Sequence, residues 1–197
     1  LFGSRERMIC ASAAAGPAFE GGRISSGMRA ATGAIAEVSI EDGSLRCGVI
    51  GGGGPRGICG SGLVDAAAAA LELGRLEASG RLRGGPLELA GTVALTQRDI
   101  RELQLAKAAV AAGIRIVLER LGAAAGDVRK VHLAGAFGNY VNRASARRIG
   151  LFEFPEEKVE PAGNTSLLGA KMALFSEDLT FAALRARVEH IGLASDP

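Results

Sequence analysis

A short apolar segment that runs directly into a glycine turn constrains the fold of this chain most. Residues 131–134 read Val-His-Leu-Ala, which is typical of a short strand, and Gly135 and Gly138 follow it closely. Because glycine has no Cβ, a ligand or another stretch of backbone can approach at both positions. Ligands of open α/β sheets bind beyond the carboxyl ends of strands, where the amides of Asn139 and Asn142 would offer polar contacts. The segment favours an α/β fold, and it allows either a ligand site or a tight turn packed on itself.

The composition argues against two kinds of partner. The 197 residues are 48% hydrophobic and 22% charged, an ordinary balance for a globular protein with a real core. Only 4% are aromatic and Trp is absent, so bases would find no stacking platform and we expect no nucleic-acid partner. No apolar run approaches the length of a membrane span, so we expect no membrane association. Three cysteines without CxxC spacing predict a reducing, cytoplasmic location.

Periodicity and turn signals predict a mixed sheet with helices packed on it. We expect extended segments over 5–12, 32–40, 45–50 and 131–134, and helices over 60–73 and 96–121. Residues 41–44 (Glu-Asp-Gly-Ser) predict a hairpin turn, and Gly74 predicts the end of the first helix. A further helix should follow the loop at 163–166, capped by Thr165 or Ser166, and the tail over 179–191 should form a helix or a strand pair.

The helix over 96–121 has the clearest pattern. Thr96 is its expected N-cap, and Asp99 three residues later makes a variant of the capping box. Helical spacing predicts one buried face and a solvated opposite face that carries Lys107. The expected buried residues are Leu103, Val110, Ile114 and Val117, and the expected solvated cluster is Arg98, Asp99, Arg101, Glu102 and Lys107.

Three glycine-rich loops, at 57–62, 135–139 and 163–166, each precede a helix. The free N–H groups and the positive dipole end of a helix suit such loops to phosphate and other anions. None matches the P-loop pattern, and each alone is better explained by an ordinary helix cap. Together they predict a nucleotide cleft. The candidate contacts are Gly60, Ser61, Gly62, Gly135, Ala136, Phe137, Gly138 and Asn139.

Three more residues carry chemistry worth weighing. Glu20 could hold a metal-bound water or a ribose, and Arg29 could meet a phosphate, although a weak surface salt bridge explains either equally well. Cys59 at a helix start could be reactive, but we favour a buried cysteine among small residues. No catalytic nucleophile set and no metal site can be assembled from the two histidines and three cysteines.

Five motifs together resemble one family over nearly the whole chain, in order. They are residues 10–21, 27–30, 57–65, 96–102 and 133–139. Their sequences resemble the C-terminal domain of the reductive activators of corrinoid proteins, iron–sulfur proteins with an actin-like ATPase domain. Five motifs in sequence order are far more specific than any one.

The resemblance implies an actin-like, ribonuclease H-like α/β lobe in an ATP-dependent electron-transfer protein. In that family a ferredoxin-like N-terminal domain carries the iron–sulfur cluster, expected here to be 2Fe–2S, and reduces Co(II) corrinoid to Co(I) on a methyltransferase partner. The actin-like domain binds ATP with Mg and the corrinoid protein, and it forms a homodimer. By similarity, residues 133–139 would approach adenosine.

The chain departs from the family pattern upstream. It starts at Leu rather than Met, and the Asp-Gly-Thr phosphate hairpins and the cluster domain are absent from it, so we expect residues 1–197 to be the second lobe, excised from a longer protein. One alternative is a docking and dimerisation module with a vestigial nucleotide cleft. Another is a relative of the acyl-CoA dehydratase activators, in which Cys59 of two subunits ligates a shared cluster with help from Cys10 or Cys47.

Overall fold

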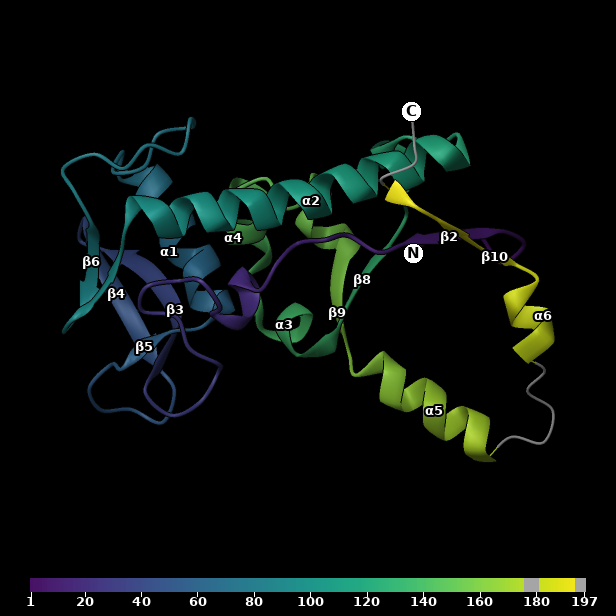
Figure 1. The fold of residues 1–197 in the computed structure, drawn as a ribbon, viewed down its shortest axis with the longest axis horizontal. Helices are drawn as coiled ribbons and strands as arrows, with labels where there is room; N and C mark the ends of the chain where they lie inside the picture. Colours follow the sequence, from purple (N-terminus) through teal and green to yellow (C-terminus); the bar gives the residue numbers. More distant parts are fainter. Residues whose placement is uncertain (176–180, 194–197) are drawn as a thin grey trace. The chain divides into compact units, whose positions relative to one another are not determined.

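The computed structural model describes residues 1–175 and 181–193, and the chain divides into two compact units (Figure 1). The first unit comprises residues 1–14, 109–139 and 152–197, and the second comprises residues 15–108 and 140–151. The long helix α2 (Gln97–Leu121) contributes residues to both.

The second unit is built on a three-stranded sheet in the order β4-β3-β5. Strands β3 (Ala34–Glu41) and β4 (Ser44–Val49) form the predicted antiparallel hairpin, in which Glu41 pairs with Ser44. The turn residues Asp42 and Gly43 have φ of 49° and 72°, which Asp and Gly tolerate better than most residues. Strand β5 (Gly57–Ile58) is parallel to β3 and covers only its first residues.

Helix α1 (Gly60–Glu72) packs against β3, and its first eleven residues are all buried. The five alanines over 66–70 let helix and strand approach closely, because their side chains end at Cβ. The helix ends at the C-cap Leu73, and Gly74 follows with φ of 67°. The predicted helix and its glycine stop are confirmed.

The remaining elements of the second unit are short. They are the 3-10 turn η1 (Ala18–Glu20), the antiparallel pair β6 (Leu87–Ala90) and β7 (Val93–Leu95), and α4 (Arg143–Arg148). Both η1 and α4 pack against α1. The Oδ1 atom of Asn142 caps α4 by accepting from the Ser145 N–H at 3.1 Å.

Helix α2 corrects part of the predicted pattern. Leu103 and Val117 are buried as expected, but Val110 and Ile114 are only half-buried. Lys107 is half-buried rather than exposed, because its Nζ donates to the carbonyl oxygen of Ile149 at 2.6 Å, at the C-terminal end of α4. A cation there is favoured by the negative end of the helix dipole.

Asp99 is the second correction, since it is fully buried and not part of a solvated face. Its Oδ2 accepts from the Thr96 N–H at 2.7 Å and the Thr96 hydroxyl at 2.9 Å, which confirms the predicted capping pair. Its Oδ1 accepts from the N–H and the hydroxyl of Ser25 at 2.7 and 3.0 Å. Asp99 therefore joins the start of α2 to the loop that contains Ser25.

The first unit contains a sheet in the order β1-β2-β10, formed by β1 (Phe2–Gly3), β2 (Met8–Ala11) and β10 (Val188–Ile191). The strand expected over 5–12 is limited to β2. The tail expected over 179–191 forms α6 (Phe181–Arg185) and β10, which runs parallel to β2; residues 179 and 180 lie outside the described residues.

A second, two-stranded sheet in this unit pairs β8 (Val131–Ala134) with β9 (Val159–Gly163) in parallel. Short turns precede both strands, η2 (Ala125–Asp127) and η3 (Glu156–Lys158), and helices follow both, α3 (Gly135–Tyr140) and α5 (Thr165–Phe175). The core includes Ile9, Val159 and Phe154, whose ring stacks on Phe152 with centroids 6.4 Å apart.

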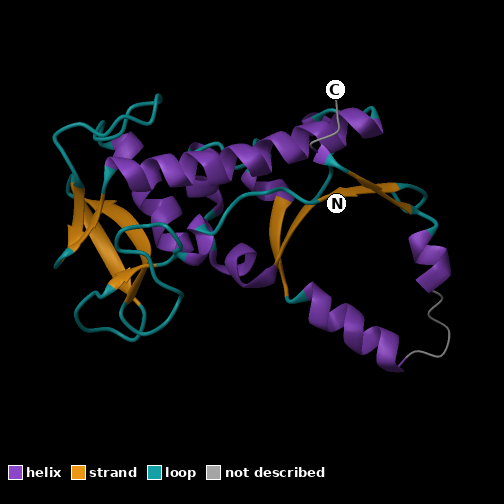
Figure 2. Ribbon diagram, in the orientation of Figure 1, coloured by secondary structure: helices purple, strands orange, loops and turns teal. Residues whose placement is uncertain are grey.

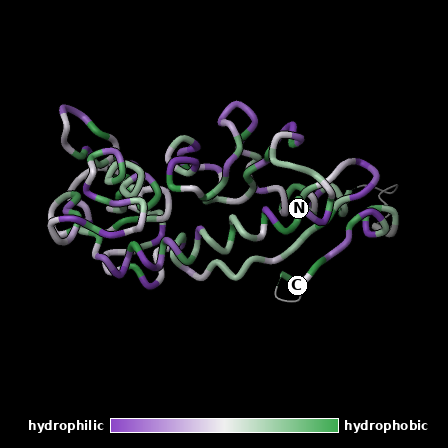
Figure 3. The backbone as a smooth tube through the Cα atoms, turned by 90° about the horizontal axis from the view of Figure 1, so that it is seen from above, coloured by the Kyte–Doolittle hydropathy of each residue, from purple (hydrophilic) through white to green (hydrophobic). Residues whose placement is uncertain are grey.

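Strands β1 to β5 come before the first α-helix, and from α1 onward α-helices and strands follow one another singly or in pairs (Figure 2). Apolar residues are spread along the whole chain between polar turns (Figure 3). Among the described residues, no helix is both long enough and apolar enough to cross a membrane.

Candidate functional site

The predicted strand and glycine turn lie at the edge where two parallel strands end. Strand β8 leads directly into α3 at Gly135, and β9 leads through Gly163 and Asn164 into α5. Ala134 and Gly163 are register partners, so the two exits are adjacent in the sheet. This is the edge at which α/β proteins bind ligands.

The two glycines of this turn differ in their surroundings. Gly135 has φ of 85°, and a Cβ built there would meet nothing within 4 Å. A Cβ at Gly138 would lie 2.9 Å from the carbonyl carbon of Leu133. Gly135 therefore opens onto free space, whereas Gly138 is required because α3 packs on the strand that precedes it. The expected loop over 135–139 is this short helix.

The amides near this edge have different tasks. Asn139 is exposed and, like exposed Ala136, is available to a ligand; Phe137 is half-buried. Asn142 is used in capping α4. Asn164 caps α5 by accepting from the Leu167 N–H at 2.9 Å, so Thr165 and Ser166 are not the caps we predicted.

Asn164 is a site candidate that the sequence reasoning placed in a glycine loop but did not single out. Its place beside the exit of β8 follows from the register of β8 and β9, which the sequence does not state. The available signal was the Gly-Asn-Thr-Ser sequence before an apolar helix, which is typical of an N-cap.

Gly60, Ser61 and Gly62 lie in the second unit, buried in the first turn of α1. A Cβ at Gly60 would fall on the carbonyl oxygen of Phe19, and one at Gly62 would fall on that of Ile35. Ser61 donates its hydroxyl to the Ala36 carbonyl oxygen at 2.8 Å. These three residues hold η1 and β3 against α1, and any ligand contact would be limited to their backbone N–H groups.

Ser61 and Asp65, one helical turn apart, both pair with the edge of β3 beyond the end of β5. The Ser61 hydroxyl donates to the Ala36 carbonyl oxygen, and the Asp65 Oδ2 accepts from the Val38 N–H at 3.3 Å. The helix thus supplies to β3 the hydrogen bonds that a longer β5 would have made. Burial raises the pKa of the Asp65 carboxyl, against the opposing effects of the Ser145 hydroxyl and the Val38 N–H.

Glu20 and Arg29 are both exposed and both lie in the second unit. Glu20 ends η1, whose Phe19 carbonyl touches the start of α1. Arg29 follows Met28, whose N–H donates to the Ile58 carbonyl oxygen at 2.9 Å. Tight packing of Gly21 against the Met28 backbone brings the two segments together. Both side chains therefore extend from the loop that contains Ser25, which is hydrogen-bonded to Asp99.

All three cysteines are free of disulfide bonds. Cys59 is only 3% exposed, with its Sγ 3.4 Å from the Ser61 Oγ, in keeping with the buried cysteine that we favoured. Cys10 and Cys47 are half-buried, and burial raises the pKa of the Cys47 thiol. Within the described residues, no group of three or more His, Cys, Asp or Glu side chains could hold a metal ion.

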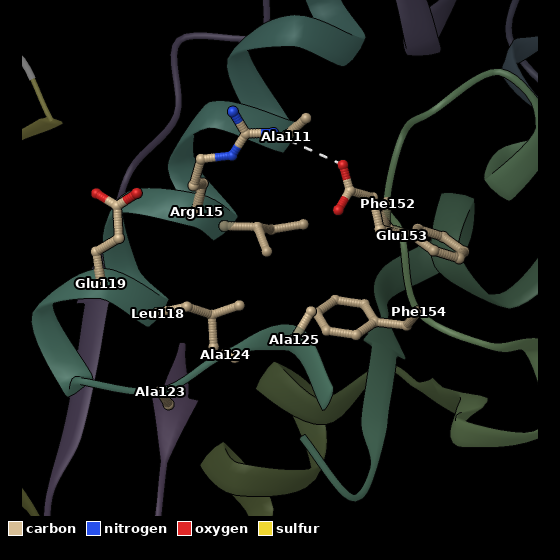
Figure 4. Close-up of a pocket in the computed structure, with 11 residues that line it drawn as sticks. Ala111, Arg115, Leu118, Glu119, Ala123, Ala124, Ala125, Phe152, Glu153 and Phe154 are labelled. Carbon is tan, nitrogen blue, oxygen red and sulfur yellow. Dashed lines mark ion pairs between the residues drawn. The ribbon is translucent and has the colours of Figure 1, made fainter. Parts of the chain in front are cut away.

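A cavity of about 260 Å³ in the first unit lies between the second half of α2 and the segments that precede β8 and β9 (Figure 4). Its lining includes Ala123, Ala125, Leu118 and Phe154, and the lining residues Arg115 and Glu153 form an ion pair at 3.6 Å. Because these segments come before the strands, the cavity lies at their amino ends, opposite Gly135.

Comparison with known proteins decides the family. A family model described as the C-terminal domain of RACo, the ASKHA domain, matches residues 1–197. The chain belongs to this family. The predicted fold class, an actin-like α/β ATPase domain, is thereby confirmed.

Two curated relatives of this RACo C-terminal domain are similar over nearly all of it. The corrinoid activation enzyme RamQ of Eubacterium limosum is 34% identical over 99% of the chain, which covers 38% of RamQ. The [Co(II) methylated amine-specific corrinoid protein] reductase of Methanosarcina barkeri is 32% identical over 96% of the chain, which covers 40% of the reductase.

A solved structure agrees with these relatives. The reductive activator for corrinoid, iron–sulfur protein has a TM-score of 0.83 and 32% identity over 98% of this chain. The chain covers 35% of that structure, and so it spans well under half the length of all three relatives.

Proposed function

We propose that residues 1–197 are the nucleotide-binding and partner-docking part of an ATP-dependent reductive activator, which returns Co(II) corrinoid to Co(I) on the corrinoid protein of a methyltransferase system. The observation that carries this proposal is the family match over the whole chain, with relatives named for corrinoid activation and for reduction of a Co(II) corrinoid protein. By the same resemblance, the active form is a cytoplasmic homodimer, and these residues are its second ATPase lobe.

Adenosine would lie at the shared exit of β8 and β9. The free space at Gly135 and the exposed Ala136 and Asn139 support this placement, and Asn164 stands at the neighbouring exit. Phe137 is half-buried and Gly138 packs on Leu133, so both support the conformation of this turn. A Cβ at Gly135 would fill space that the fold itself leaves open, as a close ligand approach requires.

In the second unit, exposed Glu20 and Arg29 are separate candidates for contact with a magnesium-bound nucleotide. Glu20 would hold a metal-bound water or the ribose, and Arg29 would contact a phosphate. The N–H groups of Gly60, Ser61 and Gly62 are the remaining candidates for anion contact in this unit. Bound Mg-ATP would supply the free energy that links docking to reduction.

The iron–sulfur cluster would lie in a separate domain of the full-length protein. The match of this chain to a C-terminal domain supports that division. Burial of Cys59 argues against the dehydratase-activator alternative, because a shared cluster needs a cysteine at the surface. A docking module with a vestigial nucleotide cleft remains the second candidate. A measurement of nucleotide binding distinguishes it from the proposed function.

Two asparagines three residues apart provide a matched test. In the full-length protein, Asn139→Ala should lower ATP affinity at least severalfold with an unchanged Tm, because the Asn139 side chain is exposed. Asn142→Ala should lower Tm and leave ATP affinity unchanged, because it removes the cap of α4. Affinity is measured by calorimetry, and corrinoid reduction by the optical spectrum of Co(I). Full-length protein that binds the corrinoid protein but no ATP would support the docking module instead.

A further inference from the structure

Helix α5 is apolar on every side, yet none of its eleven residues is buried. Its five large hydrophobic side chains are between 51% and 82% exposed: Leu167, Leu168, Met172, Leu174 and Phe175. Its only charged residue is Lys171. Water does not favour such a helix, and one that is apolar all round is normally found inside a protein.

The two faces of α5 differ in side-chain size. At helical spacing, the large residues occupy one side of the helix, and a stripe of small residues runs along the other. The small residues are Ser166, Gly169, Ala170 and Ala173. A Cβ at Gly169 would meet nothing within 4 Å, so this stripe is open at Gly169, and Ser166 and Ala170 are exposed while Ala173 is half-buried. A small stripe admits a neighbouring backbone closely, and a large face fills a core.

We propose that α5 is buried between segments of its own polypeptide, namely the N-terminal part of the full-length protein that lies outside residues 1–197. The matched family is a C-terminal domain, and the chain covers only 35% to 40% of three relatives. Most of each relative therefore lies outside the matched region. That length is available to cover the helix from two sides.

A second copy of the chain fits α5 less well. Pairing of two α5 helices about a two-fold axis covers one face of each helix and leaves the other in water. Pairing through the large faces would also bring two Lys171 ammonium groups toward each other, because Lys171 lies within that face at helical spacing. A cover from the same polypeptide can enclose both faces, while the long lysine side chain lets its ammonium reach water.

Amide hydrogen exchange of residues 165–175 tests the cover directly, in residues 1–197 and in the full-length protein. Slow exchange of α5 in the full-length protein and fast exchange in residues 1–197 is the expected result. Equal exchange in both overturns the proposal. Protection of residues 1–197 that grows with their concentration assigns α5 to a second copy, and protection that needs added corrinoid protein assigns it to that partner. Either result also overturns the proposal.

Two substitutions examine the two faces. Leu168→Lys places a charge on the large face, and Gly169→Leu fills the small stripe. In the full-length protein each should lower Tm by several degrees, whereas in residues 1–197 neither should lower it, because nothing packs there. Leu105→Lys on α2, where the leucine is 66% exposed, is the matched control and should be neutral in both. Neutral α5 variants in the full-length protein would contradict the proposal, and none of these measurements depends on ATP or corrinoid.

Discussion

Removing the carboxylate of Asp99 should destabilise the second unit strongly. Asp99 is fully buried and accepts four hydrogen bonds, two from Thr96 and two from Ser25. Asp99→Ala takes the charged acceptor away from the part-buried hydrogen bonds of the Thr96 and Ser25 N–H groups, at about 1.5–3 kcal/mol each, and removes a helix cap worth about 1 kcal/mol. Relief of the buried charge offsets part of this loss. We expect a net loss of about 3–5 kcal/mol.

Urea unfolding followed by circular dichroism measures this loss. The m-value of the variant should equal that of the wild type, which would show that both expose the same surface area on unfolding. Asp99→Asn should be nearly as harmful, because its amide nitrogen would face N–H donors instead of accepting from them. Asp127→Ala is the control, since Asp127 accepts from the Ala124 N–H at 2.8 Å in the same i, i+3 geometry but at the surface. It should cost about 1 kcal/mol or less.

A loss below about 1 kcal/mol for Asp99→Ala would refute the reasoning, because it would mean that water or another acceptor replaces the carboxylate at no cost. Equal losses for Asp99→Ala and Asp127→Ala would refute it as well, since burial and the two hydrogen bonds from Ser25 separate the Asp99 site from the Asp127 site.

Three further predictions follow from contacts inside single units. Burial raises the folded-state pKa of Asp65 above its unfolded value of about 3.9, so the free energy of unfolding should fall as pH rises from that value through the folded-state pKa. Urea titrations at several pH values should show that Asp65→Asn reduces this dependence of stability on pH. Lys107→Met should cost about 1–2 kcal/mol by thermal unfolding, since the Ile149 carbonyl loses its donor. Gly138→Val should lower the Tm of residues 1–197 in the absence of nucleotide, as its Cβ meets Leu133; an unchanged Tm would return Gly138 to the ligand hypothesis.

Local signals in the sequence predicted local structure well. The hairpin turn at Asp42 and Gly43, the helix stop at Gly74 and the Thr96–Asp99 cap each depend on residues within four positions of one another. In such cases side-chain chemistry and backbone geometry act within one turn, so the residue types alone carry the information.

Interactions between distant segments were not predictable in this way. The hydrogen bonds of Asp99 to Ser25 span 74 positions, and that of Lys107 to Ile149 spans 42. Helical periodicity places Asp99 and Lys107 on a polar face, as we predicted. It gives no information about a distant partner that buries such a residue. The hydrogen bonds of Ser61 and Asp65 to β3 were missed for the same reason: they depend on how early β5 ends.

Glycine shows where the site prediction reached its limit. A glycine in a sequence indicates either a backbone with positive φ or a close neighbour, and it does not state whether that neighbour is a ligand or the protein itself. At Gly60, Gly62 and Gly138 the close neighbour is another part of the chain, whereas at Gly135 the fold leaves the space open. From the sequence alone, all four glycines were equally good candidates for ligand contact. Because a nucleotide needs space that the protein does not fill, the hypothesis of adenosine binding depends most on Gly135 and on the exposed Asn139 beside it.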